Sequence, residues 1–324
     1  MSLDNMVVFQ KYFQTALNKI LDLQYSAFNA AVNNALILRP GSNHGDFIEQ
    51  SFVLPMDNLI HHRDPRADDS VTTIGFEMDK SRSVKTGRRI GPVEWSVTQF
   101  KWIQEDPKRA AVILAKNIAE QKFRKTFDLA VAVLAAAMGN NSNIVHDITD
   151  SVTNKKLNYG DMTTALGLFG DAYQRINTWL MHSKPMFDLF GANLANEANL
   201  FSYNGVIVKR DPFGNPMIMT DTPSLKDTTP NPDEYINLGL TPGSVIIEEN
   251  NDYTQEMVPV LGKTNIKYVW QGEYSVNVEV KNYSWDSTNG GKVPNDAALV
   301  LSTNWEVIDD TTVKVLPGVK LITI

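Results

Sequence analysis

The segment 105–141 constrains the fold more than any other part of the chain, because its pattern is that of one unbroken helix. Asp106 is a good N-cap, Pro107 suits the first helical position, and Gly139 suits the helix end. The pattern predicts a helix over residues 107–138, roughly 48 Å long and about three times the average length.

This helix has an apolar stripe, and its second half is apolar on every side. The stripe consists of Phe123, Phe127, Val131, Leu134 and Met138. A helix that is apolar all round is covered on several sides, so we expect residues 129–138 to lie inside a core.

The N-terminal region carries a second helical stripe. Apolar side chains recur at mostly three- and four-residue steps, namely at Met6, Phe9, Phe13, Leu17, Ile20, Phe28, Val32 and Leu36. We expect a helical arm over residues 3–38, ended by Arg39-Pro40-Gly41. It packs either on its own domain or on another subunit, which makes Phe9, Phe13 and Leu17 candidate inter-subunit contacts.

The remaining pattern is mixed. Residues 51–100 read as strands around polar turns, an extended β-ribbon with a charged tip that needs a partner surface. Residues 161–182 suggest a helix capped by Asp161, and 204–221 suggest a hairpin. The C-terminal part is rich in strand-forming residues. The sequence therefore predicts an α+β protein.

Composition excludes several classes of protein. The chain of 324 residues has no cysteine, which rules out disulfides, thiol nucleophiles and cysteine metal sites. The N-terminus lacks a secretory signal pattern, and the longest apolar run, Leu129–Met138, is well short of the ~20 residues that span a bilayer. We expect no membrane association.

Motifs for chemistry are lacking. Gly262-Lys263-Thr264 lacks the preceding glycine of a phosphate loop, because Met257 stands there. His61 and His62 are adjacent in an extended stretch and so point in opposite directions, which makes a poor metal chelate. We expect no catalytic residue, no metal, no cofactor and no enzymatic activity.

Charge is placed unevenly along the chain, whose net charge is −7. Residues 1–220 hold 23 basic and 22 acidic side chains, whereas 221–310 hold 5 basic and 15 acidic ones. One segment, 80–89, is sharply basic, with five cations in ten residues: Lys80, Arg82, Lys85, Arg88 and Arg89. It could be a solvated turn or a nucleic-acid contact. We favour docking on the acidic 221–310 surface of another copy of the chain.

The order of these parts resembles the major capsid protein of tailed bacteriophages, with the Hong Kong 97 type fold. "FGNPMIMTDTPSL", "LTPGSVIIEEN", "YSWDSTNGGKVPNDAALVLSTNWEVI" and "LPGVKLI" are similar to segments of that family. The resemblance covers essentially the whole chain. It implies an N-terminal arm (1–50), an extended loop (51–100), a peripheral domain with the spine helix (101–160 and 270–324) and an axial domain (161–269).

The resemblance also implies a function and partners. Hexamers and pentamers of the chain would assemble, in the host bacterial cytoplasm, into an icosahedral virion shell around double-stranded DNA that is bound without sequence specificity. The sequence shows no additional scaffolding segment before the arm, so we expect a separate scaffolding protein unless such a segment was cleaved off. We also expect a portal protein and a decoration protein. Two alternatives stay open: an encapsulin-like compartment shell, and an enzyme whose site is scattered along the sequence.

Overall fold

The computed structural model describes residues 3–43, 45–53, 78–96, 105–151, 155–190, 199–210, 215–262, 264–308 and 312–324, with single residues 60, 66, 70, 73 and 75. The helices are α1 (Leu3–Ala31), α3 (Pro107–Gly139), α4 (Tyr159–Gly167), α5 (Ser183–Phe190) and α6 (Asp296–Leu299), with 3-10 turns η1 (Ser142–Ile144), η2 (Gly170–Arg175), η4 (Pro223–Leu225), η5 (Ser302–Asn304) and η6 (Val313–Val315). The strands are β1 (Leu36–Gly41), β2 (Phe47–Val53), β3 (Met78–Ser96), β4 (Val145–Asp147), β5 (Thr178–Met181), β6 (Asn199–Tyr203), β7 (Val206–Arg210), β8 (Pro216–Met219), β9 (Lys226–Asp227), β10 (Glu234–Leu240), β11 (Val245–Asn250), β12 (Thr254–Val260), β13 (Lys267–Val280), β14 (Tyr283–Trp285), β15 (Trp305–Val307) and β16 (Gly318–Thr323).

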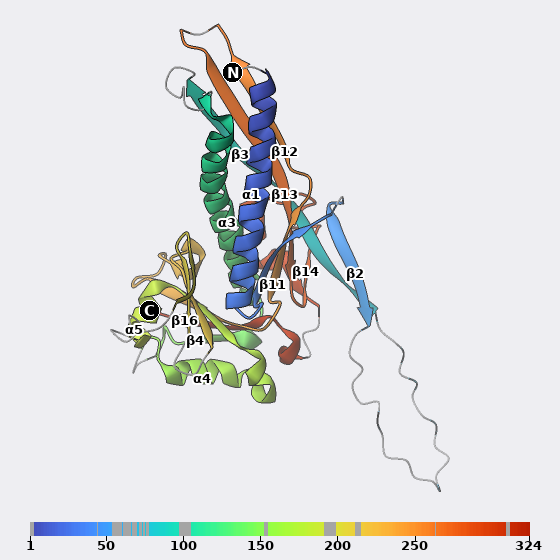
Figure 1. Ribbon diagram of the computed structural model, residues 1–324. Helices are drawn as coiled ribbons and strands as arrows, with labels where there is room; N and C mark the ends of the chain where they lie inside the picture. The colour runs from blue at the N-terminus through green and yellow to red at the C-terminus, as the bar shows by residue number, and fades with distance from the viewer. Residues whose placement is uncertain are drawn as a thin grey trace.

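The α+β class is confirmed, and two long helices dominate the molecule. Helices α1 and α3 pack side by side along the long axis and cover one face of a sheet that contains β3, β11, β12 and β13 (Figure 1). The smaller elements α4, α5, β4 and β16 gather at one end, and β2 projects to the side with the adjoining end of β3 (Figure 1).

Helix α3 begins and ends close to the expected residues. The Asp106 side chain accepts a hydrogen bond from the backbone N–H of Arg109 at 3.1 Å, and Pro107 is the first helical residue. Its apolar half is buried, as expected, from Leu129 to Met138 apart from the partly exposed Ala132 and Ala136. An aromatic cluster surrounds its middle: Tyr25, Phe28, Phe123, Phe127, Phe201 and Tyr203.

The N-terminal helix is shorter than expected. It ends at Ala31, and Asn33 and Asn34 turn the chain with φ of 52° and 55°. Asparagine tolerates this left-handed backbone better than most residues, so two consecutive asparagines stop the helix. The apolar residues beyond them continue as strand β1.

Asn29 covers the open side of β1. Its amide nitrogen donates to the carbonyl oxygen of Leu38 at 2.8 Å, and its amide oxygen accepts from the N–H of Leu38 at 3.0 Å. The other side of β1 pairs in parallel with β11. The Asn29 side chain therefore satisfies a backbone donor and acceptor that the sheet leaves free.

The first sheet has the order β1-β11-β13-β3-β2, with β12 also paired to β13. Strand β3 is central, with β13 along Val84–Ser96 and β2 along Met78–Val84. The basic segment 80–89 is therefore regular strand and not a turn or loop, which corrects that part of the expectation. The expected charged tip of the ribbon lies mostly outside the described residues.

The second sheet has the order β4-β16-β10-β5-β8-β7-β6, with β9 paired to β10. The expected hairpin is confirmed, since β7 and β8 are antiparallel neighbours. The prediction of a helix over 161–182 is wrong for its second half. Helix α4 ends at Gly167 and is followed by η2 and the buried strand β5. Asn158 caps α4, and Asp161 only donates its backbone N–H to that cap at 3.0 Å.

The division into arm, extended loop, peripheral and axial domains stays a prediction, and strand pairing departs from its boundaries at two places. Strands β11 and β12 pair with β13 in the first sheet, although 245–269 were expected in the axial part. Strand β16 pairs with β10 in the second sheet, although the C-terminal strands were expected in the peripheral part. Long-range pairing of this kind leaves no local trace in the sequence.

Candidate inter-subunit contact site

Two of the five basic residues lie where β3 runs alongside β2. Arg82 contacts Glu49 of β2 at 2.7 Å, and Lys80 lies 3.7 Å from the same carboxylate. The hydrogen bond and charge of Arg82 lower the pKa of Glu49 below its ordinary value. Arg82 also donates to the hydroxyl of Ser287 at 2.8 Å. Lys80 and Arg82 thus link β3 to β2 through Glu49.

Two more basic residues pair with the acidic region of the same chain. Lys85 contacts Asp252 at 3.2 Å, and Arg88 contacts Asp296 at 2.5 Å. Burial by itself would raise the pKa of Asp252, but hydrogen bonds from Ser275 and the charge of Lys85 lower it. The attraction that we expected between subunits is thus realised within the subunit at these two positions.

Arg89 differs from the other four basic residues of the segment, each of which has an ion pair within the chain. Its side chain is exposed, and it has no ion pair or hydrogen bond with any residue in the described part of the chain. Together with Lys80, whose side chain is 65% exposed, it is what the basic segment still presents to a partner.

The apolar candidates in the arm lie inside the subunit. Phe9, Phe13 and Leu17 are 1%, 0% and 0% exposed. The rings of Phe13 and Trp270 of β13 meet edge to face at 5.1 Å. The structure corrects the expectation for these three residues, because they form the chain's own core and could reach another subunit only if α1 left it.

A buried ion pair between α3 and β11 was missed by sequence reasoning. Lys122 Nζ bonds to a carboxylate oxygen of Glu249, and its side chain is only 2% exposed. The ammonium lies 4.0 Å from the ring centroid of Tyr274. Burial lowers the pKa of Lys122, and Glu249 opposes that shift. Burial also raises the pKa of Tyr274 to about 12.

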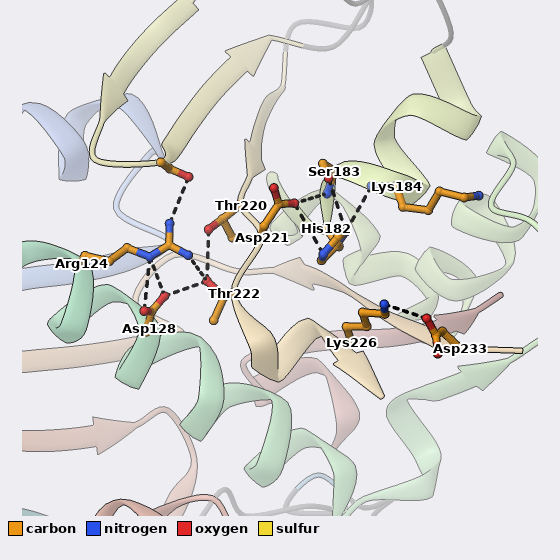
Figure 2. Close-up of polar contacts among 11 residues, drawn as sticks. Arg124, Asp128, His182, Ser183, Lys184, Thr220, Asp221, Thr222, Lys226 and Asp233 are labelled. Atoms are coloured by element: carbon orange, nitrogen blue, oxygen red, sulfur yellow. Dashed lines mark hydrogen bonds and ion pairs between the residues drawn. The ribbon is translucent and has the colours of Figure 1, made fainter. Parts of the chain in front are cut away.

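A polar junction connects α3 to the second sheet (Figure 2). Arg124 pairs with Asp128 at 3.0 Å and donates to the carbonyl oxygen of Gly205 at 3.1 Å. The hydroxyl of Thr222 donates to Asp128 at 2.8 Å and lies 3.1 Å from that of Thr220. Because Asp128 is held from both sides, the loop after β8 is fixed against the helix.

The same loop binds the start of α5 (Figure 2). Asp221 accepts from the N–H of Ser183 at 3.3 Å and lies 3.5 Å from His182 Nε2. Burial lowers the pKa of His182, and Asp221 offsets part of that shift. Ser183, His182 and Asp221 do not form a working catalytic triad. Ser183 Oγ and Asp221 each lie 3.5 Å from the imidazole, and Nδ1, the nitrogen nearest Ser183, already accepts a hydrogen bond from the backbone N–H of Lys184 at 3.2 Å.

Among the residues that the structure describes, no three His, Asp or Glu side chains come together in a way that could hold a metal ion. No helix within that part of the chain combines the length and apolar character needed to cross a bilayer.

Comparison with protein families gives one match that covers nearly all of these elements. Residues 5–320 match the Gp13-like family, described as major capsid protein 13-like. The chain belongs to this family. It is a structural protein of a capsid shell and not an enzyme, as expected, and a shell implies that many copies associate with one another. Its place is the capsid of the virion.

Solved structures of phage proteins match the chain at low sequence identity. A chain of Mycobacterium phage Bobi is 12% identical with a TM-score of 0.49, covering 90% of this chain and 89% of its own. The capsid of Myoviridae phage XM1 is 11% identical with a TM-score of 0.47, covering 90% of each chain. The cyanophage Pam1 capsid is 10% identical with a TM-score of 0.46, covering 74% and 81%. No curated protein sequence matches the chain.

Proposed function

We propose that the chain forms the wall of a closed icosahedral shell, in which hexamers and pentamers enclose the double-stranded DNA of a tailed bacteriophage. The observation that carries this proposal is the capsid family match over residues 5–320. The projecting β2–β3 ribbon and the paired long helices suit the Hong Kong 97 type arrangement that the sequence suggested (Figure 1).

The proposal includes partners. A separate scaffolding protein directs assembly in the host cytoplasm, a portal protein occupies one vertex, and a decoration protein binds the finished shell. The DNA is held without sequence-specific contacts. The net charge of −7 supports this, because a wall that is negative overall does not retain DNA through release of counterions.

Within the shell, the exposed cations Lys80 and Arg89 are the part of the basic segment that meets a neighbouring subunit. Arg82, Lys85 and Arg88 take part through the shape of the ribbon that they stabilise, since their own charges are paired inside the chain. Charge complementarity of this kind sets orientation and association rate more than affinity.

The first experiment is sedimentation of the purified chain, with electron microscopy of any fast-moving fraction. Closed shells or hexamer sheets support the proposal, and shells that carry protein cargo in place of DNA would support an enzyme compartment. If the chain stays a monomer alone, it is co-expressed with the scaffolding gene from the same gene cluster. Persistence of the monomer there would contradict the proposal.

The proposed contact of the basic segment with a neighbouring subunit is tested with Arg89→Glu in β3. The matched control is Lys116→Glu, which reverses an exposed charge on α3. Arg89→Glu should keep the circular dichroism spectrum and melting temperature of the parent and lose assembly, while the control assembles. Normal shells from Arg89→Glu would remove the basic segment from the interface.

A further inference from the structure

A pocket of about 520 Å³ lies between β3, α3 and η4 and collects positive charge. Arg88 and Arg89 line it from β3, Lys125 lines it from α3, and Ser224 lines it from η4. These segments belong to different layers of the molecule, since β3 is in the first sheet and η4 follows the last strand of the β7–β8 hairpin in the second.

The carboxylates at this pocket are already neutralised. Asp128 is bonded by Arg124 and by the hydroxyl of Thr222, and Asp296 is paired with Arg88 at 2.5 Å. Lys125 therefore leaves one positive charge that no carboxylate neutralises. Its side chain is exposed and has no ion pair or hydrogen bond with the described residues. Arg88 lies opposite Tyr274 of β13, which contacts Lys122 of α3, so Arg88 faces the α3 side, whereas the adjacent Arg89 directs its side chain to the other face of the sheet.

Two hydrogen-bond donors at the pocket also lack an acceptor among the described residues. Nη2 of Arg88 is buried and has no hydrogen-bond partner in the described part of the chain. A buried guanidinium N–H without an acceptor is unfavourable, so an acceptor placed there gains more than one on the surface would. The half-buried Ser224 hydroxyl is also without a partner in those ranges and adds a neutral donor.

From this combination we propose that the pocket between β3, α3 and η4 is a binding site for a phosphate-type oxyanion. Guanidinium and ammonium groups bind phosphate oxygens through short, charge-assisted hydrogen bonds, and arginine matches their spacing. The oxyanion is either free inorganic phosphate or a phosphodiester of DNA. The inference does not depend on shell formation, because all of the groups come from one subunit.

Binding has a structural consequence. A single anion held by β3, α3 and η4 at once links the first sheet, the spine helix and the loop after β8. It therefore favours the folded subunit over the unfolded chain, and the melting temperature rises with ligand concentration.

The test uses the full-length chain and two readouts, the melting temperature and isothermal titration calorimetry. Inorganic phosphate is titrated at constant ionic strength, with acetate at the same ionic strength as the comparison. We expect phosphate and not acetate to raise the melting temperature. Lys125→Ala should weaken phosphate binding about tenfold, the size of one charge-assisted hydrogen bond. Lys116→Ala, an exposed lysine on α3 that does not line the pocket, should leave it unchanged.

A short DNA duplex distinguishes the two sources of the oxyanion. If the duplex binds with salt-sensitive affinity that Lys125→Ala reduces, the ligand is the phosphodiester; if only inorganic phosphate binds, it is the free ion. Equal effects of phosphate and acetate, or full phosphate binding by Lys125→Ala, would overturn the proposal. Tighter binding of a glutamate-rich peptide than of phosphate would also overturn it and assign the pocket to an acidic protein segment.

Discussion

Removing the negative charge of Glu249 tests the buried pair that joins α3 to the first sheet. Glu249→Gln keeps the shape of the side chain but leaves the ammonium of Lys122, which is only 2% exposed, without its counter-charge. Breaking one half of a buried pair costs about 3–5 kcal/mol of unfolding free energy. We expect the loss of unfolding free energy caused by Glu249→Gln to lie in that range at pH 7.

The loss of unfolding free energy has an upper limit and depends on pH. Lys122 can escape by losing its proton, which from the ordinary pKa of 10.5 costs at most about 4.8 kcal/mol at pH 7, at about 1.4 kcal/mol per pH unit. Burial already lowers the pKa of Lys122 against the pull of Glu249, so Glu249→Gln lowers it further. The unfolded chain then binds a proton that the folded variant does not, and the cost of the substitution should shrink as pH rises from 7 to 9.

Urea unfolding followed by tryptophan fluorescence, with circular dichroism as a check that one transition is fitted, gives the free energies. Lys122→Met combined with Glu249→Leu is the matched control, because an apolar pair of similar volume should stay within about 1 kcal/mol of the parent. A cost for Glu249→Gln below about 1 kcal/mol that is flat with pH would refute the reasoning.

Three further substitutions test the packing and the charges. Gly318→Ala should cost at least about 3 kcal/mol, because a Cβ there would lie 1.9 Å from the backbone oxygen of Gly239; Gly167→Ala in α4, where a Cβ meets nothing within 4 Å, is the control, and both are measured by urea unfolding. Phe123→Ala should cost about 3–5 kcal/mol in the same assay, since it empties the centre of the aromatic cluster; a loss under about 1 kcal/mol would mean that the cluster collapses around the gap. Asp252→Asn should flatten the loss of stability as pH falls below the ordinary carboxyl pKa of 3.8, because the lowered pKa of Asp252 means that the unfolded chain takes up its proton first; an unchanged acid melting curve would contradict this.

Local signals in the sequence predicted the elements that depend on few neighbours. Asp106, Pro107 and Gly139 bounded α3 to within one residue, because caps and helix ends are decided by adjacent residues. The β7–β8 hairpin was found for the same reason. By contrast, the predicted helix ran past Ala31. Val32 in the turn and Leu36 in β1 are buried apolar residues that happen to continue the three- and four-residue spacing of the helical stripe.

The charged groups could be found but not their partners. The basic segment was visible in the sequence, yet Lys85 and Arg88 pair with residues more than 160 positions away that only the folded sheet brings near. Lys122 looked like one of several lysines on an amphipathic helix. Its burial depends on Glu249, Tyr253 and Tyr274, which come from the other sequence half, so no local pattern could reveal it.

The amide of Asn29 has a consequence for solubility. An edge strand with free N–H and C=O groups is a template on which another chain can form an unwanted intermolecular sheet. A shell protein accumulates as many identical copies, so an accessible β1 edge would invite aggregation in competition with ordered assembly. Asn29 occupies that edge at Leu38, and Pro40, two residues on and on the same side, has no N–H to offer. Leu38 and Pro40 therefore offer no free N–H on that side of β1, which disfavours pairing of another copy along this part of the edge.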